Sequence, residues 1–287
     1  MSRLIVVSNR VNPPTDIGQG PAGGLAMALA AALREYSGIW FGWSGETTET
    51  FGGQISMQKI GGVTVALVDL EEQDREEYYD GYANRTLWPL FHSRTDLASY
   101  ERSFGEGYAR VNRRFAETLA PLIGPGDLVW VHDYHLIPLA AELRALGVTN
   151  RIGFFLHIPW PGRRQMTTLP QHRQLVESLL AYDLVGFQSR DALDAFGDYV
   201  TREVDLAIVD GVVDFDGRRT RIGNFPIGIE AEAFALDAAS SSRRPPIRGG
   251  GDGRGAFGRI AKCPSLIWPS GCCRPAPSCS SAPSPLA

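Results

Sequence analysis

Residues 128–159 read LVWVHDYHLIPLAAELRALGVTNRIGFFLHIP. Leu128–His132 and Ile152–Leu156 are short, largely apolar runs, typical of strands buried on both faces of a parallel sheet. Between them, residues 136–146 predict a helix that closes at Gly147, since glycine is common just after a helix C-terminus. A strand, a helix and a second strand in this order predict a βαβ unit with parallel strands.

The same alternation continues on both sides of this unit. An apolar strand is predicted at Leu4–Ser8, and a glycine-rich loop then leads into a helix over 25–33. The remaining predicted elements are strands at 38–43, 63–68 and 184–187, and helices starting near 71 and spanning 106–123, 171–181 and 190–202. Residues 204–213 and 214–222 predict a β-hairpin with an Asp-Gly turn. The pattern is that of a doubly wound α/β domain with a parallel sheet.

The composition changes abruptly near residue 240. Residues 1–236 carry all of the patterned elements and are predicted to form one domain. Residues 237–287 are rich in Arg, Gly, Pro, Ser and Cys without periodicity, and we expect a disordered tail there, because such a segment buries too little apolar surface to offset its ordering entropy. The four cysteines lie in this tail at spacings that fit neither a zinc site nor a redox pair.

Charge and hydropathy exclude several classes of partner. The net charge is −4, but residues 241–287 hold seven Lys and Arg against one Asp, a net of +6, so the rest of the chain carries −10. An acidic body argues against nucleic-acid binding. No run of ~20 apolar residues predicts a membrane helix and the N-terminus has no signal-cleavage pattern, so we expect a cytoplasmic protein.

Glycines near the N-terminus admit two interpretations. Residues 18–23 spell G-x-G-x-x-G, yet about ten residues and two prolines separate them from the first strand, which disfavours a dinucleotide-binding dehydrogenase. Gly23 and Gly24 still precede a predicted helix, whose N-terminal N–H groups favour a phosphate or sugar oxygen. An ordinary glycine-rich loop is the alternative.

Polar side chains are predicted at the carboxyl ends of three strands, the edge where open α/β sheets bind ligands. Arg10 suits a phosphate, Asp133 accepts hydrogen bonds from hydroxyls, and His157 is placed to donate to or polarise a sugar oxygen. Surface charges and a structural histidine are the alternatives. His132 and His135 lack a third ligand cluster, so no metal site is predicted.

Four aromatic residues lie in or beside segments that resemble turns: Trp40, Trp43, Tyr79 and Trp88. Aromatic rings with polar tips suit a sugar, because they stack on its apolar face and hydrogen-bond its rim. Core packing is the alternative for each, and it is favoured for Trp40, which points to the opposite face of its strand from Trp43.

Taken together, the ordered strings WFGWSGE (40–46), HDYHL (132–136) and GFFLHIPWP (153–161) resemble the trehalose-6-phosphate synthase family. The resemblance covers roughly residues 1–236. It implies a glycosyltransferase of the B-type fold, with two Rossmann-like domains facing a cleft, that transfers glucose from UDP-glucose to glucose 6-phosphate with retention of configuration and without a metal or other cofactor.

The resemblance also implies residue roles. Arg10, Tyr79 and Asp133 would bind glucose 6-phosphate in a pocket shaped by Trp43 and Trp88. Gly23 and Gly24 would approach the UDP-glucose donor, and His157 would contact the transferred glucose near the reacting centre. Family members form homo-oligomers, a property not carried over to this chain.

Residues after Phe225-Pro226-Ile227-Gly228-Ile229-Glu230 depart from the family. The family continues into the donor domain, whose V-x-R-L-D-Y-x-K-G segment supplies an Arg and a Lys to the UDP diphosphate, and a further Arg there binds the acceptor phosphate. None of these is present in the 287 residues, and the abrupt change of composition predicts a shift of reading frame or a pseudogene near residue 240. We therefore expect an acceptor-side domain without synthase activity of its own; a non-catalytic sugar-phosphate-binding module is the alternative.

Overall fold

A computed structural model describes residues 3–11, 33, 38–60 and 63–226. The predicted helix at 25–33, the glycines Gly23 and Gly24, and the tail at 237–287 lie almost entirely outside these ranges. The predictions made for them, including the domain boundary at 236, stay predictions.

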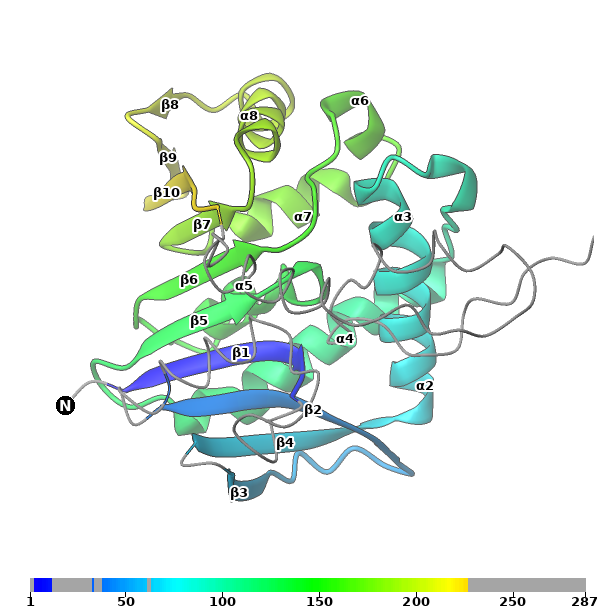
Figure 1. Ribbon diagram of the computed structural model, residues 1–287, viewed down its shortest axis with the longest axis vertical. Helices are drawn as coiled ribbons and strands as arrows, with labels where there is room; N and C mark the ends of the chain where they lie inside the picture. Colours follow the sequence, from blue (N-terminus) through cyan, green and yellow to red (C-terminus); the bar gives the residue numbers. More distant parts are fainter. Residues whose placement is uncertain (1–2, 12–32, 34–37, 61–62, 227–287) are drawn as a thin grey trace, which may run out of the picture.

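Ten strands of the described part form one sheet, ordered β3-β4-β2-β1-β5-β6-β7-β10-β9-β8 (Figure 1). Their bounds are β1 Leu4–Arg10, β2 Ile39–Thr48, β3 Ser56–Ile60, β4 Val63–Glu71, β5 Leu128–His132, β6 Ile152–Leu156, β7 Leu184–Phe187, β8 Ile208–Val209, β9 Val212–Phe215 and β10 Arg218–Asn224. All neighbouring pairs from β4 to β10 are parallel, whereas β3, β9 and β8 pair antiparallel at the two ends. The predicted parallel α/β sheet is confirmed.

Helices connect β4 to β5, β5 to β6 and β6 to β7, and a further helical segment follows β7. Their bounds are α2 Glu72–Asp74, the π-helix η1 Arg75–Leu87, α3 Trp88–Phe91, α4 Arg102–Leu119, α5 Leu139–Ala145, α6 Arg163–Met166, α7 His172–Leu179, α8 Arg190–Tyr199 and the π-helix η5 Val200–Val204, with short 3-10 turns at Thr95–Leu97, Ala120–Leu122 and Tyr134–Leu136. The helix predicted at 136–146 begins only at Leu139, with Pro138 as its N-cap, and a 3-10 turn at Tyr134–Leu136 precedes it.

Side chains from the two faces of the sheet form separate cores. On one face, β-strand residues such as Phe41 and Val131 pack with Phe115 of α4 and Leu143 of α5. The other face carries a smaller cluster of Leu4, Val6, Trp40 and Val65, among others. Trp40 and Trp43 therefore lie on opposite faces, which confirms the predicted core position of Trp40.

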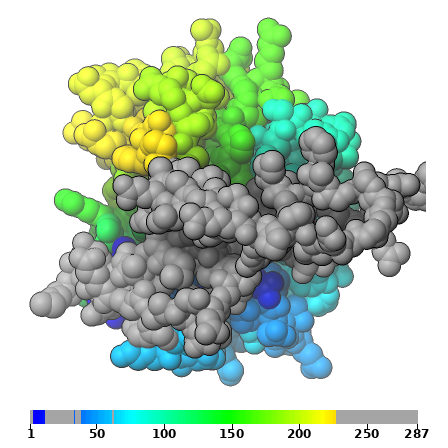
Figure 2. Space-filling view, in the orientation of Figure 1, coloured from blue at the N-terminus to red at the C-terminus, as the bar shows by residue number. Residues whose placement is uncertain are grey.

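The C-terminal end of the sheet is a double hairpin, and Figure 2 shows it (yellow) at the opposite end of the molecule from β3 and β4 (blue to cyan). Asp216 and Gly217 turn β9 into β10 with positive φ values of 47° and 71°, as a type I′ turn requires, so the predicted Asp-Gly turn is confirmed. Asp210 and Gly211 make a second such turn, with φ of 51° and 71°. It divides the segment predicted as one strand, 204–213, into the two short strands β8 and β9.

Candidate functional site

Four adjacent parallel strands end beside one another and carry four of the eight residues predicted to bind a ligand. In the order β2-β1-β5-β6, their carboxyl ends bring Arg10, Asp133 and His157 to one edge, and Trp43 lies opposite Arg10 in the β1–β2 pairing. Because parallel strands end at the same edge, residues far apart in the sequence are brought together here.

Arg10 and Trp43 are in direct contact. The guanidinium carbon of Arg10 lies 5.7 Å from the centre of the Trp43 ring, within the range of a cation–π interaction. Gly45 lies directly beneath the guanidinium, because a Cβ built at this glycine would sit 2.4 Å from the nearest Arg10 nitrogen. Arg10 is exposed, so the ring and the glycine position a cation that solvent or a ligand can reach.

Tyr79 extends this contact from the sheet to the helical layer. Its ring meets Trp43 edge-on at 5.5 Å and stacks on His135 at 5.8 Å between ring centres. Tyr79 lies within η1, not beside a turn as predicted, because 75–87 continues as one helical segment into α3. Arg10, Trp43, Tyr79 and His135 therefore form a continuous row of contacts.

The position of η1 is fixed by polar contacts on both sides of Tyr79. Next to it, Tyr78 donates a hydrogen bond from its hydroxyl to Asn9 Oδ1, at 2.7 Å, and so ties the helix to β1. On the other side, the fully buried carboxylate of Asp74 accepts from Arg110 at 2.8 Å and also contacts Arg114, both on α4. A buried carboxylate is tolerated only with such partners.

Asp133 has an uncommon backbone conformation. Its φ of 74° and ψ of 166° fall in a region that is almost restricted to glycine, and strain of this kind clusters at functional sites. The residue is 6% exposed, and burial raises the pKa of its carboxyl to about 7. Backbone hydrogen bonds from Tyr134 and His157 partly oppose that rise. The carboxyl of Asp133 therefore presents oxygen atoms that accept hydrogen bonds at the edge of the sheet.

His157 lies next to Asp133 and to a second histidine. Its backbone N–H donates to Asp133 Oδ1 at 3.3 Å, and its Nε2 lies 2.9 Å from Nδ1 of His132. Burial lowers the pKa of His157 to about 4 and that of His135 to about 3. Neither ring nitrogen of His135 has a hydrogen-bond partner in the described part of the chain.

The two remaining groups of predicted residues are placed differently. Trp88 is half-buried at the start of α3 and stacks on His92 at 4.1 Å, on the helical segment that carries Tyr79. Gly23 and Gly24 lie outside the described residues.

The site residues that were not predicted from the sequence are Gly45, His132 and His135. The two histidines lie on either side of Asp133 in the string HDYHL, and this string could have identified them as site residues. Nothing in the sequence reveals that Gly45 supports Arg10.

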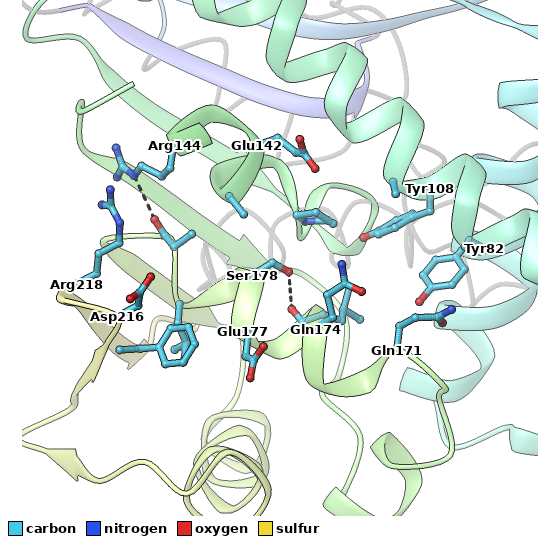
Figure 3. A pocket seen from close by; sticks show the side chains of 18 residues that line it. Tyr82, Tyr108, Glu142, Arg144, Gln171, Gln174, Glu177, Ser178, Asp216 and Arg218 are labelled. Carbon is cyan, nitrogen blue, oxygen red and sulfur yellow. Dashed lines mark hydrogen bonds between the residues drawn. The ribbon is translucent and has the colours of Figure 1, made fainter. Parts of the chain in front are cut away.

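A separate cavity of about 420 Å³ lies between α4, α5, α7 and the β9–β10 turn (Figure 3). Tyr82 and Tyr108 line one end, and Arg144 and Arg218 line the other. Arg218 is the first residue of β10, so this cavity opens away from the carboxyl edge, and none of the predicted ligand residues lines it. We do not assign the candidate site to it.

In the ranges that the structure describes, no three His, Cys, Asp or Glu side chains gather closely enough to hold a metal ion. Within the same ranges, every helix is too short or too polar to cross a bilayer.

Residues 3–247 match the family model of glycosyltransferase family 20. The chain belongs to this family. A curated relative, the trehalose-6-phosphate synthase of Sinorhizobium fredii, is 49% identical over 251 residues, which cover 86% of this chain and 54% of the relative.

Solved structures show the same likeness for this family 20 chain. An alpha,alpha-trehalose-phosphate synthase (UDP-forming) from Burkholderia vietnamiensis superposes with a TM-score of 0.80 at 45% identity, covering 86% of this chain and 53% of that one. A UDP-forming synthase from Burkholderia xenovorans in complex with glucose-6-phosphate superposes at 0.75, also with 45% identity, over 86% and 54%. The fold is thus that of one Rossmann-like domain of these enzymes, and the chain spans about half the length of the relatives it matches.

Proposed function

We propose that the carboxyl edge of this family 20 domain binds glucose 6-phosphate as the acceptor in a UDP-forming glucosyl transfer. The observation that carries the proposal is the row Arg10–Trp43–Tyr79, which joins an exposed guanidinium to aromatic rings at the strand ends. A homologous structure, 45% identical, was solved in complex with glucose-6-phosphate, which supports the same ligand here.

Each group at the edge suits one part of this ligand. The planar guanidinium of Arg10 offers paired N–H donors to the phosphate oxygens. The Trp43 and Tyr79 rings bring apolar surface and a phenol to the sugar, and Trp88 closes the pocket on the helical side. Asp133 accepts hydrogen bonds from sugar hydroxyls, for which burial and the adjacent N–H of His157 hold it in place.

The UDP-glucose donor would approach the same edge of the sheet. We propose that Gly23 and Gly24 approach UDP-glucose, that His157 contacts the transferred glucose, and that the reaction proceeds without a metal. Charge on the departing diphosphate needs cationic or N–H partners, each worth ~3 to 4 kcal/mol in comparable sites. The Arg and Lys that the family resemblance assigns to that role are absent from these 287 residues.

It follows that a polypeptide of these 287 residues binds the acceptor and does not catalyse transfer alone. Calorimetric titration with glucose 6-phosphate, glucose and inorganic phosphate tests the first part. We expect measurable binding of glucose 6-phosphate and much weaker binding of the other two, since each lacks half of the contacts. Equal affinity for glucose 6-phosphate and inorganic phosphate would contradict a site built for the sugar.

Release of UDP from UDP-glucose in the presence of glucose 6-phosphate, with and without a chelator, tests the second part. No release is expected from the purified 287-residue chain. If the chain binds glucose 6-phosphate but releases no UDP, it acts in isolation as a sugar-phosphate-binding module. Release of UDP that resists the chelator would make this chain a complete transferase. A cytoplasmic location is part of the proposal, because both substrates are phosphorylated sugars, and cell fractionation checks it.

A further inference from the structure

His132 and His157 form a pair of rings at the ends of β5 and β6. Nδ1 of His132 lies 2.9 Å from Nε2 of His157, and the ring planes differ by only 23°. Trp130 packs against His132 at 4.4 Å and Phe155 against His157 at 4.7 Å between ring centres. The pair is thus held between aromatic side chains from the same two strands.

Both rings are neutral at pH 7. Burial lowers the pKa of His157 to about 4, and burial with the neighbouring ring lowers the pKa of His132 well below its ordinary value. A neutral imidazole carries one proton, so one nitrogen donates and the other accepts. The short contact between the rings therefore permits two arrangements, in which either His132 donates to His157 or the reverse.

The second nitrogen of His132 distinguishes these arrangements. His132 is 2% exposed, and its Nε2 is buried with no hydrogen-bond partner in the part of the chain that the structure describes. If His157 were the donor, the single proton of His132 would lie on Nε2 as a buried N–H without an acceptor. Orphaned buried N–H groups are rarer than unpaired acceptors, so the proton of His132 belongs on Nδ1.

We infer that His132 is a positioning residue that fixes His157 in the Nδ1–H tautomer by donating to its Nε2. Nε2 of His157 is then occupied, and Nδ1–H becomes the group that this side chain offers at the carboxyl edge. The tautomer assignment needs no ligand. Its consequence rests on the proposed function: His157 holds a sugar oxygen as a neutral hydrogen-bond donor and does not remove a proton through Nε2.

Nitrogen-15 NMR of the histidine side chains in the intact 287-residue chain tests this inference directly. At pH 7, His157 should show an unprotonated Nε2 and a protonated Nδ1. His132 should also show an unprotonated Nε2 and a protonated Nδ1. In His132→Leu, which removes the donor, His157 should revert toward the Nε2–H form that free histidine prefers in water. His135→Phe is the matched control, because it alters a second buried histidine, three residues after His132, whose ring makes no hydrogen bond to His157, and it should leave the signals of His157 unchanged.

A protonated Nε2 on His157 in the unmodified chain would overturn the inference, even if the leucine variant does not fold. An unchanged His157 tautomer in folded His132→Leu would also overturn it. Neither result bears on the acceptor site, because glucose 6-phosphate binding is measured separately by calorimetry. Conversely, a chain that fails to bind glucose 6-phosphate can still show the predicted tautomers.

Discussion

The carboxylate of Asp133 accepts a hydrogen bond from the backbone N–H of His157 at 3.3 Å, which links the ends of β5 and β6. In return, the backbone N–H of Asp133 donates to the carbonyl of Phe155 at 2.8 Å. These two bonds hold Asp133 in a strained conformation and bury its acceptor at the edge where the sheet meets a ligand.

Replacing Asp133 by Asn should stabilise the domain at alkaline pH. The folded pKa of Asp133, about 7, lies above its ordinary value of 3.8. Its stabilising contribution is therefore complete below pH 4 and is lost as the pH rises toward 7. Asn carries no charge and has nearly the shape of Asp, so it bears the same backbone strain and the comparison measures the free-energy cost of ionising Asp133. Urea unfolding should show Asp133→Asn more stable by roughly 2 to 4 kcal/mol at pH 8 and nearly equal at pH 4. A constant difference across this range would contradict the raised pKa.

Replacing Gly45 by Ala should weaken acceptor binding through Arg10. A Cβ at this position overlaps the Arg10 guanidinium and must displace it, and φ of 98° disfavours any side chain. The loss of one charge-assisted hydrogen bond, about 1.5 kcal/mol, predicts an affinity for glucose 6-phosphate lower by about tenfold or more. Gly52→Ala is the control, because a Cβ there meets its first neighbour only at 3.9 Å. Equal affinities of the two variants would show that Gly45 does not position Arg10.

Replacing Asp74 by Asn should destabilise the fold. Asp74 is fully buried and pairs with Arg110 and Arg114, so its removal leaves two partly buried cations without their shared partner. Breaking a buried pair costs about 3 to 5 kcal/mol, which thermal or urea unfolding measures. Asp96→Asn is the matched surface variant, since its pair with Arg94 is more than half exposed and solvent screens it, so its loss should be much smaller. Similar losses in both variants would mean that the Asp74 pair does not hold η1 to α4.

Replacing His135 by Phe should reduce the sensitivity of the fold to acid. Burial lowers the pKa of His135 to about 3, so its contribution to stability is present above its ordinary pKa of 6.5 and is lost as the pH falls. Between pH 7 and pH 5, the unmodified chain should lose about 2 kcal/mol more than the variant. Phe keeps the stacking on Tyr79, so affinity for glucose 6-phosphate at pH 7 should stay within about threefold. Parallel stability curves for the two chains would contradict this account.

The sequence predicted those parts of the fold that depend on local pattern. Apolar runs such as Ile152–Leu156 and the Asp216-Gly217 turn specify their own structure, and strand ends predicted that Arg10, Asp133 and His157 share an edge. Edge strand β3 was missed because its residues Ser56–Ile60 are mostly exposed and show no alternation.

Other features depend on contacts between distant segments. The helical continuation of η1 through Leu87 was not predicted; the start of this segment is held to α4 by the pair between Glu77 and Arg110, which lie 33 residues apart in the sequence. The support of Arg10 by Gly45 and the pairing of His132 with His157 likewise exist only once strands have assembled. No periodicity or spacing in the sequence carries that information.

Calorimetric titration of the unmodified chain and of Arg10→Ala with glucose 6-phosphate tests the central claim most directly. Arg102→Ala is the control, because Arg102 is 91% exposed and pairs only with Glu106 one turn along α4 among the described residues. The account predicts saturable binding by the unmodified chain and by Arg102→Ala, and loss of at least tenfold in affinity in Arg10→Ala. Equal binding by all three chains, or no binding by the folded unmodified chain, would contradict an acceptor site at the carboxyl edge of the sheet.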